Sequence, residues 1–353
     1  MKNPGTRRTT LKDIAREVGM SFTSVSRILR GDPLFNEKTI RKVQQQARKL
    51  KYRPNIMARA LVSRGNSMIG LVLRDIQHSF YVDIIAGVQE ELEPRGYSII
   101  LGNSSLDPID EKRHLKILAD KLAEGIIITP ISAGAVNRQA YREAQNLGMP
   151  LVMIGNPKAG VKAPFVKVDN VLGGQLAAKY LIDLGHRDFV YLTCGQDELR
   201  HHKSTHKSEN IERFEGFHQV LREHDLAERC FVAEAANSIV TGHTIGQILS
   251  IRPRPTAIFV YSDMISFQLI RMLLERGVRI PYDFSIVGYD DIETASLVTP
   301  PLTTIAQPKK DMGKLAALKM IDMLEGKPAG GTILTPILVI RESASRPARP
   351  ESD

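Results

Sequence analysis

The sequence has no tryptophan, only two cysteines and no long hydrophobic run. Cys194 and Cys230 cannot staple a chain of 353 residues, so we expect reduced thiols in a cytoplasmic protein. No apolar run approaches the length of a membrane helix, and the basic N-terminal stretch lacks the apolar core of a secretory signal. The sequence therefore favours a globular protein without a membrane segment, built from two or three domains.

The sequence also lacks the common motifs of catalysis and metal binding. It contains no P-loop, no dinucleotide-binding glycine motif in the right context, no Ser/His/Asp nucleophile signature and no zinc-ligand spacing. His201, His202 and His206 lie in the polar stretch RHHKSTHKSEN, where a metal site is one reading and a surface loop is the commoner one. We therefore expect no catalytic residues, no metal and no cofactor, and a protein that is not an enzyme.

The positive charge is concentrated at the N-terminus. Residues 1–65 contain 16 Lys and Arg against 4 Asp and Glu, a net charge of +12, whereas the other residues contain 32 against 35, a net of −3. A basic module joined to a near-neutral body indicates nucleic-acid binding, although charge alone would also fit a solvated basic face.

This basic segment contains three short helical patterns. The stretch TTLKDIAREVG begins with Thr10 as a helix N-cap, has Asp13 three residues later in a capping-box arrangement, and ends at Gly19. The next pattern, SFTSVSRILRG, begins at Ser21 and ends at Gly31, and a third runs through EKTIRKVQQQARKLKY. Two short helices joined by a tight turn predict a helix-turn-helix.

The second of these helices is unusually rich in hydroxyl groups, which favour caps and turns over helix interiors. Its apolar residues are expected to face the core: Val25, Ile28 and Leu29. The other face carries candidates for contacts in the DNA major groove: Phe22, Thr23, Ser26 and Arg27. Hydroxyls reach phosphates and base edges, and an arginine can bind guanine through two hydrogen bonds. The alternative, solvated positions on a helical bundle, is disfavoured by the local charge.

Beyond the stretch KYRPN, a short helix capped by Asn55 is expected, followed by a linker. From Met68 onward, strand-like runs such as MIGLVL, EGIIITP, PLVMIGN, TAIFVYS and DFSIVGYDD alternate with helical stretches such as DNVLGGQLAAKYLIDLGH, whose glycines predict close packing. Apolar strands between helices predict parallel sheets covered on both faces, and the length predicts two α/β lobes. Ligands of such sheets bind at the carboxyl ends of the strands, which indicates a small molecule between the lobes.

At this point the sequence resembles a known family. TLKDIAREVGMSFTSVSRILRG, KYRPN and ARAL resemble the DNA-binding and hinge segments of the LacI/GalR family of bacterial transcription regulators. The resemblance continues through IGLVLRDIQHSFY, VDNVLGG, RFEGF and SIVGYDDIETASLVTPPLTTIAQP, over nearly the whole chain. It implies an all-α helix-turn-helix domain, and an α/β core of two lobes resembling periplasmic sugar-binding proteins. It also implies a homodimer, near-palindromic operator DNA and a small sugar-like effector.

The resemblance also implies domain boundaries. The expected segments are residues 1–54 for the helix-turn-helix domain, 55–66 for the hinge helix and linker, 67–341 for the effector core and 342–353 for a disordered tail. One lobe is expected to contain about 67–167 and 308–328, and the other about 168–307 and 329–341.

The resemblance also implies the contact residues. By this resemblance, Phe22, Thr23 and Arg27 occupy the positions that contact the DNA bases. Leu61 occupies the position of the hinge residue that wedges into the minor groove and kinks the operator. The full expected DNA-contacting set is Thr10, Ser21, Phe22, Thr23, Ser24, Ser26, Arg27, Asn55, Ala58 and Leu61. The expected effector-contacting set is Asp75, Phe80, Arg213, Ser262, Asp290, Gln307 and Lys309. For Phe80, packing in the core is an equally good interpretation.

The sequence departs from the family pattern near the expected cleft. Ser262 stands where the family often has asparagine, and Arg74 where proline is common. Arg74 and Lys309 would add positive charge to Arg213 and favour an anionic effector, unless they pair with Asp75 and Asp311. Two other function classes stay open at this point. A sugar-binding receptor without DNA function would fit the core alone, and an enzyme would need a catalytic constellation that the sequence does not present.

Overall fold

The chain divides into two compact units, residues 1–66 and 67–353, and each is described by itself. The computed structural model describes residues 9–29, 32, 34–52, 67–131, 136–158, 160–194 and 208–348. The described part of the first unit contains the helices α1 (Leu11–Val18), α2 (Phe22–Leu29) and α3 (Glu37–Lys49). They surround a small core that includes Ile14, Val25 and Val43.

The helix caps of this first unit follow the sequence prediction. Thr10 Oγ1 accepts the Asp13 backbone N–H while the Asp13 carboxylate accepts the Thr10 N–H, which completes the predicted capping box. Gly19 ends α1 in the left-handed conformation, with φ of 69°. Ser21 Oγ accepts the N–H of Ser24 at 3.0 Å and so caps α2. The helix-turn-helix prediction is therefore confirmed, while Gly31 lies outside the described residues.

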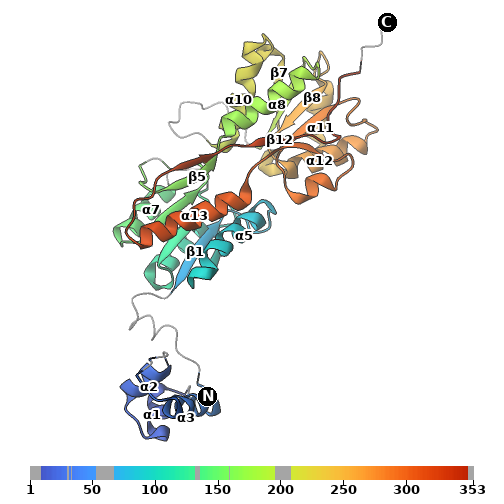
Figure 1. Ribbon diagram of the computed structural model, residues 1–353. Helices are drawn as coiled ribbons and strands as arrows, with labels where there is room; N and C mark the ends of the chain where they lie inside the picture. Colours follow the sequence, from blue (N-terminus) through green and yellow to red (C-terminus); the bar gives the residue numbers. More distant parts are fainter. Residues whose placement is uncertain are drawn as a thin grey trace, which may run out of the picture. The chain divides into compact units, whose positions relative to one another are not determined.

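The second unit consists of two lobes, each built on a six-stranded sheet (Figure 1). Lobe one has the strand order β11-β5-β4-β3-β1-β2, and all of its strand pairs are parallel. Its elements are β1 (Met68–Leu73), α5 (Phe80–Leu92), β2 (Ser98–Asn103), α6 (Pro108–Ile117), β3 (Gly125–Ile128), α7 (Val136–Asn146), β4 (Leu151–Ile154), β5 (Phe165–Val168), α13 (Lys309–Leu324) and β11 (Thr332–Leu334).

Lobe two has the strand order β12-β10-β9-β8-β6-β7, in which only the β10–β12 pair is antiparallel. Its elements are α8 (Asn170–Asp183), β6 (Phe189–Thr193), α10 (Glu209–Glu223), β7 (Cys230–Glu234), α11 (Gly242–Ser250), β8 (Ala257–Val260), α12 (Asp263–Leu274), β9 (Ser285–Asp290), β10 (Thr303–Ala306) and β12 (Ile337–Val339). The apolar runs predicted as strands form β1, β3, β4, β8 and β9, and they are largely buried.

Helices cover both faces of each sheet, as the apolar strands require. In lobe one, α5 and α13 lie side by side on one face, and α6 and α7 contribute to the core on the other (Figure 1). In lobe two, α8 and α10 pack together, while α11 and α12 cover the opposite face. The close approach of α8 and α10 depends on Gly174 and Gly216, where an added Cβ would meet backbone atoms of the facing helix. The prediction that the glycines of DNVLGGQLAAKYL serve packing is thus confirmed.

The expected division of the C-terminal segment between the lobes is wrong in one place. Residues 329–341 were expected in lobe two, but β11 pairs in parallel with β5 of lobe one, with Thr332 opposite Val166. Only β12 joins lobe two, where Ile337 lies opposite Ala306 of β10. The run TILTPILV reads as one strand, yet Pro336 interrupts it because proline cannot donate to a sheet ladder. The last crossing between the lobes therefore lies between β11 and β12.

The expectation of a disordered tail from residue 342 is also wrong for the described residues up to 348. The Ser343 backbone carbonyl accepts the N–H of Ile286 at 2.7 Å. The Ser343 hydroxyl accepts the N–H of Thr303 at 2.8 Å and donates to the Ile286 carbonyl at 2.6 Å. Farther on, Ser345 accepts from His186 and donates its N–H to Ser285. A polar composition suggested disorder, but here the serines supply the hydrogen bonds that fasten the segment to lobe two.

His186 anchors this C-terminal segment in its neutral form. Its Nε2 atom lies 2.9 Å from the Ser345 carbonyl, which only accepts, so Nε2 carries the proton and Nδ1 accepts from the Thr256 hydroxyl at 2.8 Å. The ring is almost fully buried, and this burial lowers the pKa of His186 to about 4.

We expect this histidine to make the stability of the core pH-dependent. The folded state disfavours the protonated ring, so the stabilisation is complete above the ordinary pKa of about 6.5 and is lost as the pH falls toward 4. The loss in free energy of unfolding should reach up to about 3 kcal/mol. Denaturant unfolding of wild type and His186→Gln between pH 7 and pH 4 measures it. Wild type should lose more free energy of unfolding than His186→Gln over this pH range. His224→Gln, which replaces an exposed histidine, is the control. Parallel pH profiles for wild type and His186→Gln would rule out this role of His186.

Candidate functional site

The outer face of α2 presents polar and aromatic groups to solvent. Phe22 is 49% exposed, unusually high for a phenylalanine, and Ser21, Thr23 and Arg27 are exposed beside it. Ser24 is half-buried and hydrogen-bonded to Ser21. Thr10, at the start of α1, is also exposed. This face has the composition that the sequence predicted for contacts with DNA.

Ser26 departs from the predicted arrangement. It was expected on the outer face of α2, yet it is 6% exposed and lies within the bundle. On a helix, Ser26 is turned only about 100° from Val25, and the inward stripe of a packed helix can be at least that wide. Ser26 is therefore corrected from a DNA-contacting residue to an interior one.

Arg27 is held in a defined position on the exposed face. Its Nε atom donates to the Asp32 carboxylate at 2.7 Å, and its guanidinium lies 5.8 Å from the centre of the Phe35 ring. The hydrogen bond from Arg27 holds the pKa of Asp32 below its ordinary value. Fixing Nε in this way orients the guanidinium before any ligand arrives. The other expected DNA contacts, Asn55, Ala58 and Leu61, lie outside the described residues.

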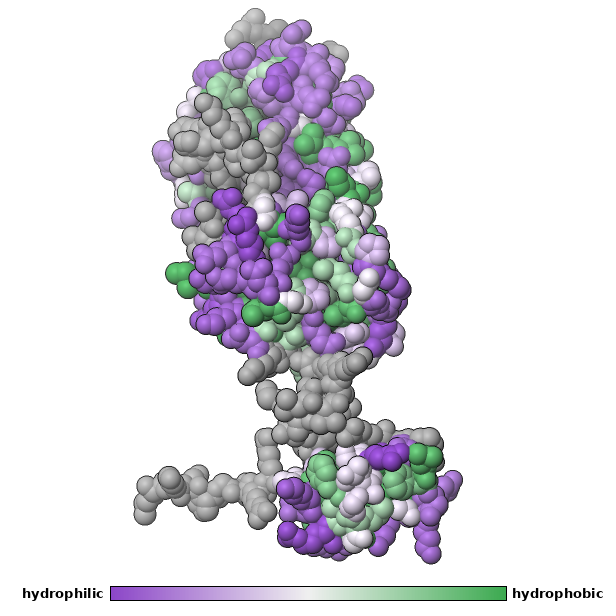
Figure 2. All heavy atoms as spheres, turned by 90° about the vertical axis from the view of Figure 1, so that its left-hand side faces the viewer, coloured by the Kyte–Doolittle hydropathy of each residue, from purple (hydrophilic) through white to green (hydrophobic). Residues whose placement is uncertain are grey.

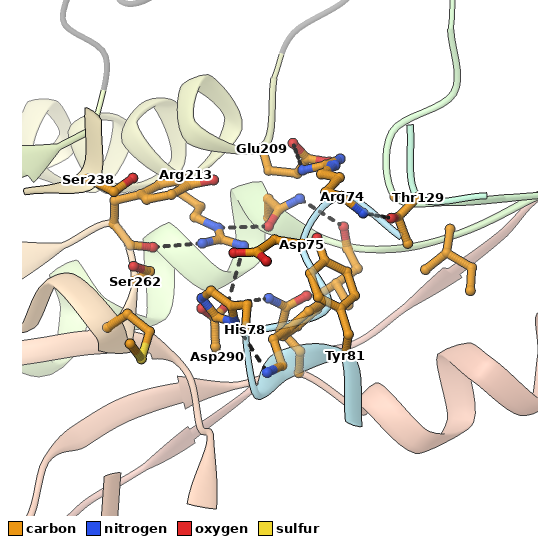
Figure 3. A pocket seen from close by; sticks show the side chains of 18 of the residues that line it. Arg74, Asp75, His78, Tyr81, Thr129, Glu209, Arg213, Ser238, Ser262 and Asp290 are labelled. Carbon is orange, nitrogen blue, oxygen red and sulfur yellow. Dashed lines mark hydrogen bonds and ion pairs between the residues drawn. The ribbon is translucent and has the colours of Figure 1, made fainter. Parts of the chain in front are cut away.

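The second unit contains a cavity of about 200 Å³ between its two lobes (Figure 3). A large part of its wall comes from residues at or just after the carboxyl ends of the strands in both sheets. These are Arg74 and Asp75 after β1, Thr129 after β3, Gly155 after β4, Asn170 after β5, Tyr261 and Ser262 after β8, Asp290 at the end of β9 and Gln307 after β10. This is the position that parallel α/β sheets give to ligand sites.

Arg213 on α10 is held in the cavity wall by several contacts. Its Nε donates to Asn170 Oδ1 at 3.0 Å, and its Nη1 donates to the Tyr261 carbonyl at 2.6 Å. Its guanidinium lies 3.6 Å from the centre of the Tyr289 ring, a cation–π distance. Nη2 lies 3.6 Å from an Asp290 carboxylate oxygen. The guanidinium is thus fixed as a donor at the cavity wall.

Asp290 faces Arg213 across this wall from an unusual backbone conformation. Its φ of 117° is rare for a residue with a side chain, and such geometry gathers at functional sites. Oδ1 accepts from Gln307 Nε2 at 2.7 Å. Burial raises the pKa of Asp290, and Arg213 opposes that rise. The pair provides a donor and an acceptor at one place, which suits a ligand hydroxyl group.

The structure brings six of the seven expected effector residues together around the cavity. They are Asp75, Phe80, Arg213, Ser262, Asp290 and Gln307. Phe80 agrees with both of its interpretations, effector contact and core packing, because it lines the cavity and also packs against the lobe-one core. Its ring meets that of Tyr81 edge to face, with centroids 5.2 Å apart.

Lys309 is the exception and is corrected here. It does not line the cavity, because its Nζ donates to the backbone carbonyls of Asp290 at 2.9 Å and Asp291 at 2.6 Å. Arg74 does line the cavity, but its Nη2 is 2.7 Å from Glu209 Oε1. The cavity wall therefore carries two guanidinium groups against three carboxylates, those of Asp75, Glu209 and Asp290. The excess of positive charge expected in the cleft is not found.

Sequence reasoning missed several residues of the cavity wall. Among them are His78, Tyr81, Asn170, Glu209 and Tyr261. Tyr261 directly follows β8 and Asn170 lies two residues after the end of β5, so the rule that ligands bind at strand carboxyl ends could have found them. His78 accepts the Phe80 N–H through Nδ1 at 3.2 Å, which leaves the Nε2–H of the neutral ring as a donor. No local sequence pattern indicates His78 or Glu209 as a cavity residue, because neither follows a strand directly.

The described part of the chain shows neither a metal site nor a membrane helix. Within the described ranges, no three side chains of His, Cys, Asp or Glu are placed to hold a metal ion, and His201, His202 and His206 lie outside those ranges. No helix in the described part of the chain is long and apolar enough to cross a membrane.

Comparison with known proteins identifies the family. The family model of bacterial regulatory proteins, lacI family, matches residues 10–55, and that of the periplasmic binding protein-like domain matches 178–344. The ribose operon repressor of Haemophilus influenzae is 31% identical over 95% of this chain and 98% of its own length. The chain belongs to the lacI family of bacterial regulatory proteins.

Solved structures agree with this lacI-family assignment. The Lac repressor dimer bound to operator and the anti-inducer ONPF superposes with a TM-score of 0.81 at 22% identity, covering 96% of this chain and all of that one. A LacI-family regulator from Enterococcus faecalis V583 with bound ribose gives a TM-score of 0.66 at 26% identity, covering 79% and 99%. The fold is thus that of a helix-turn-helix domain joined to a periplasmic-binding-protein-like core. The relatives are transcriptional regulators, which leaves no support for the enzyme and receptor alternatives.

Proposed function

We propose that this lacI-family regulator is a repressor whose affinity for operator DNA is controlled by a small neutral sugar bound between the two lobes. It acts as a homodimer in the cytoplasm, where its DNA target lies. The observation that carries the proposal is the cavity between the lobes, which both polar and apolar side chains line and at whose wall Arg213 is fixed. The same chain carries a helix-turn-helix whose outer face is exposed.

The charge and the size of the cavity support a neutral ligand of one sugar ring. Two guanidinium groups face three carboxylates on the wall, and this balance repels an anion. The volume of about 200 Å³ lies below the roughly 300–1,000 Å³ of sites for drug-sized ligands. A monosaccharide fits these limits better than a disaccharide.

The wall also has the mixture of groups that a sugar ring requires. Apolar side chains such as Phe80, Ile154 and Met312 can cover the C–H faces of the ring. Arg213 donates and Asp290 accepts, so that hydroxyl groups on the ring edge can exchange hydrogen bonds with both. A ligand with hydroxyl groups around its edge would satisfy these partners.

Exposed apolar side chains support the homodimer. Figure 2 shows hydrophobic side chains gathered in patches among hydrophilic ones on one face of the second unit. Large apolar residues are exposed on both lobes, including Ile109 at 72% and Leu297 at 73%. Extended apolar patches on a soluble protein mark interaction surfaces. A two-fold dimer reads mirrored half-sites, so the operator should be near-palindromic.

Two experiments test the proposal. A thermal-shift screen of neutral sugars, beginning with D-ribose, should reveal a ligand that raises Tm, because a ligand of the native state stabilises it by mass action. Selection of binding sites from random DNA should return a near-palindrome. A selected site with a single asymmetric half would contradict the dimer, and calorimetry that found only sugar acids or phosphates bound would contradict the neutral effector.

Arg27→Ala should relax sequence preference. Loss of an arginine that contacts a guanine should cost ~1–3 kcal/mol of binding to the selected site and remove the preference at one base pair of each half-site. Arg48, exposed on α3, provides the control, because removing its charge should weaken selected and random DNA to the same extent. Fluorescence anisotropy on both DNAs makes the comparison. If Arg27→Ala behaves like Arg48→Ala, Arg27 does not read sequence.

A further inference from the structure

Arg74 and Glu209 form a buried ion pair that joins the two lobes at the cavity wall. Arg74 follows β1 of lobe one, and Glu209 begins α10 of lobe two. Nη2 of Arg74 lies 2.7 Å from Oε1 of Glu209, and Nη1 lies 3.5 Å from Oε2. The side chains are only 16% and 11% exposed, and both line the cavity, as the upper part of Figure 3 shows. The guanidinium of Arg74 thus meets a carboxylate of its own chain where a ligand could otherwise reach it.

Lobe one holds Arg74 firmly in this place. Its Nε donates to the Pro130 carbonyl at 2.8 Å, and its backbone N–H donates to Thr129 Oγ1 at 2.9 Å. The two terminal nitrogens are thereby aimed at Glu209 as a planar fork, the geometry that matches a carboxylate or a phosphate. Without Glu209, this fork would be a ready receptor for an anion.

The surroundings of Glu209 increase the attraction for negative charge. Lys158 of lobe one acts on Glu209 as a second cation, and together with Arg74 it holds the pKa of this carboxyl below its ordinary value despite burial. Gly155 provides the space, because an added Cβ there would lie 3.0 Å from Glu209 Oε1 and 3.4 Å from Arg74 Nη2. Lobe one therefore offers an anion-binding corner, and the carboxylate of Glu209 fills it.

We propose that Glu209 determines effector specificity by occupying this corner, so that the cleft rejects sugar acids and sugar phosphates and accepts neutral sugars. The inference deepens the proposed function and rests on it for the identity of the ligand. The carboxylate of Glu209 would then compete with any anionic group of a ligand for Arg74. Neutralising this residue should convert Arg74 from a paired side chain into a binding group.

Glu212 is a matched control on the same turn of α10. It forms another ion pair between the lobes, with its Oε1 2.8 Å from Lys167 Nζ, and the two side chains are 14% and 17% exposed. Glu212 does not line the cavity. Glu209→Gln and Glu212→Gln therefore each remove one buried charge that bridges the lobes, but only the first change alters the charge of the cavity wall.

The first test uses inorganic phosphate as the probe and does not depend on the sugar. At constant ionic strength, replacing chloride with phosphate should raise Tm of Glu209→Gln by several degrees more than that of wild type or Glu212→Gln. The double variant Arg74→Met/Glu209→Gln should lose this gain, because the receiving guanidinium is absent. An equal phosphate response in wild type and Glu209→Gln would overturn the proposal, and so would a response retained in the double variant.

The second test compares D-ribose with D-ribose 5-phosphate by calorimetry on the full chain. Wild type and Glu212→Gln should prefer ribose, and Glu209→Gln should narrow that preference about tenfold, the effect of one close charge pair. An unchanged preference in Glu209→Gln would count against the role of Glu209. If wild type binds neither compound, D-ribose is not the effector, while the phosphate test still decides whether Glu209 fills an anion site.

Discussion

Arg213→Met should raise the dissociation constant for D-ribose by roughly 100-fold. The guanidinium makes directed hydrogen bonds to Asn170 and Tyr261 and lies over the Tyr289 ring, so it is held in one place as a charged donor at the cavity wall. Its loss also leaves Asp290 buried without its cationic partner, which should lower the free energy of unfolding by ~3 kcal/mol. Isothermal calorimetry and denaturant unfolding measure the two effects separately.

Two companion variants make the Arg213 experiment specific. Arg213→Lys keeps the charge but loses the planar fork, and should recover stability better than it recovers ribose affinity. Arg222→Met, on the exposed side of the same helix, should bind ribose as wild type does. If Arg213→Met binds ribose as tightly as wild type does, Arg213 at the cavity wall does not bind the effector.

Gly216→Ala should destabilise the second unit by ~3 kcal/mol, although it adds only a methyl group. The added Cβ would collide with the Val171 backbone on α8, so α8 and α10 would have to separate. That movement would displace Arg213, which is carried by α10, and weaken ribose binding as well. Gly246→Ala, in α11, is the control, because its Cβ would meet no atom within 4 Å.

The two glycine variants should move stability in opposite directions. Alanine is about 1 kcal/mol better than glycine inside a helix, so Gly246→Ala should stabilise slightly. Urea unfolding of both proteins gives the comparison directly. Equal effects from the two substitutions would show that the packing of α8 against α10 is not tight.

Much of the fold is readable in the sequence because central parallel strands are buried on both faces. MIGLVL and TAIFVYS are continuously apolar for that reason, and they became β1 and β8. Several strands were not predicted, and β7 and β10 show the physical reason. β7 is an edge strand and only partly buried. β10 begins with Thr303 and Thr304, which are fully buried but hydrogen-bonded to Ser343 and Asp263, so no apolar run marks it.

The candidate site was predictable only in part. The expected site residues, Arg213 and Asp290 among them, came from family resemblance. The position of Asp290 at the end of β9 agrees with the general rule for parallel sheets, whereas Arg213 lies on α10. Charge pairing was not predictable, because Arg74 meets Glu209 from 135 positions away and Lys309 turns to backbone carbonyls. Such contacts depend on how the lobes face each other, which no local pattern encodes. The hypothesis of an anionic effector assumed unpaired positive charge from Arg74 and Lys309 in the cleft, and this assumption was wrong.

The most direct test of the account is operator binding by the full chain with and without sugar. Fluorescence anisotropy would follow wild type and Arg213→Met on the duplex obtained by site selection, in the absence and presence of saturating D-ribose. The account predicts that ribose changes the operator dissociation constant of wild type at least about fivefold, the lower range of allosteric coupling, and leaves that of Arg213→Met unchanged. Equal operator affinity with and without ribose, while calorimetry shows ribose bound to wild type, would contradict it.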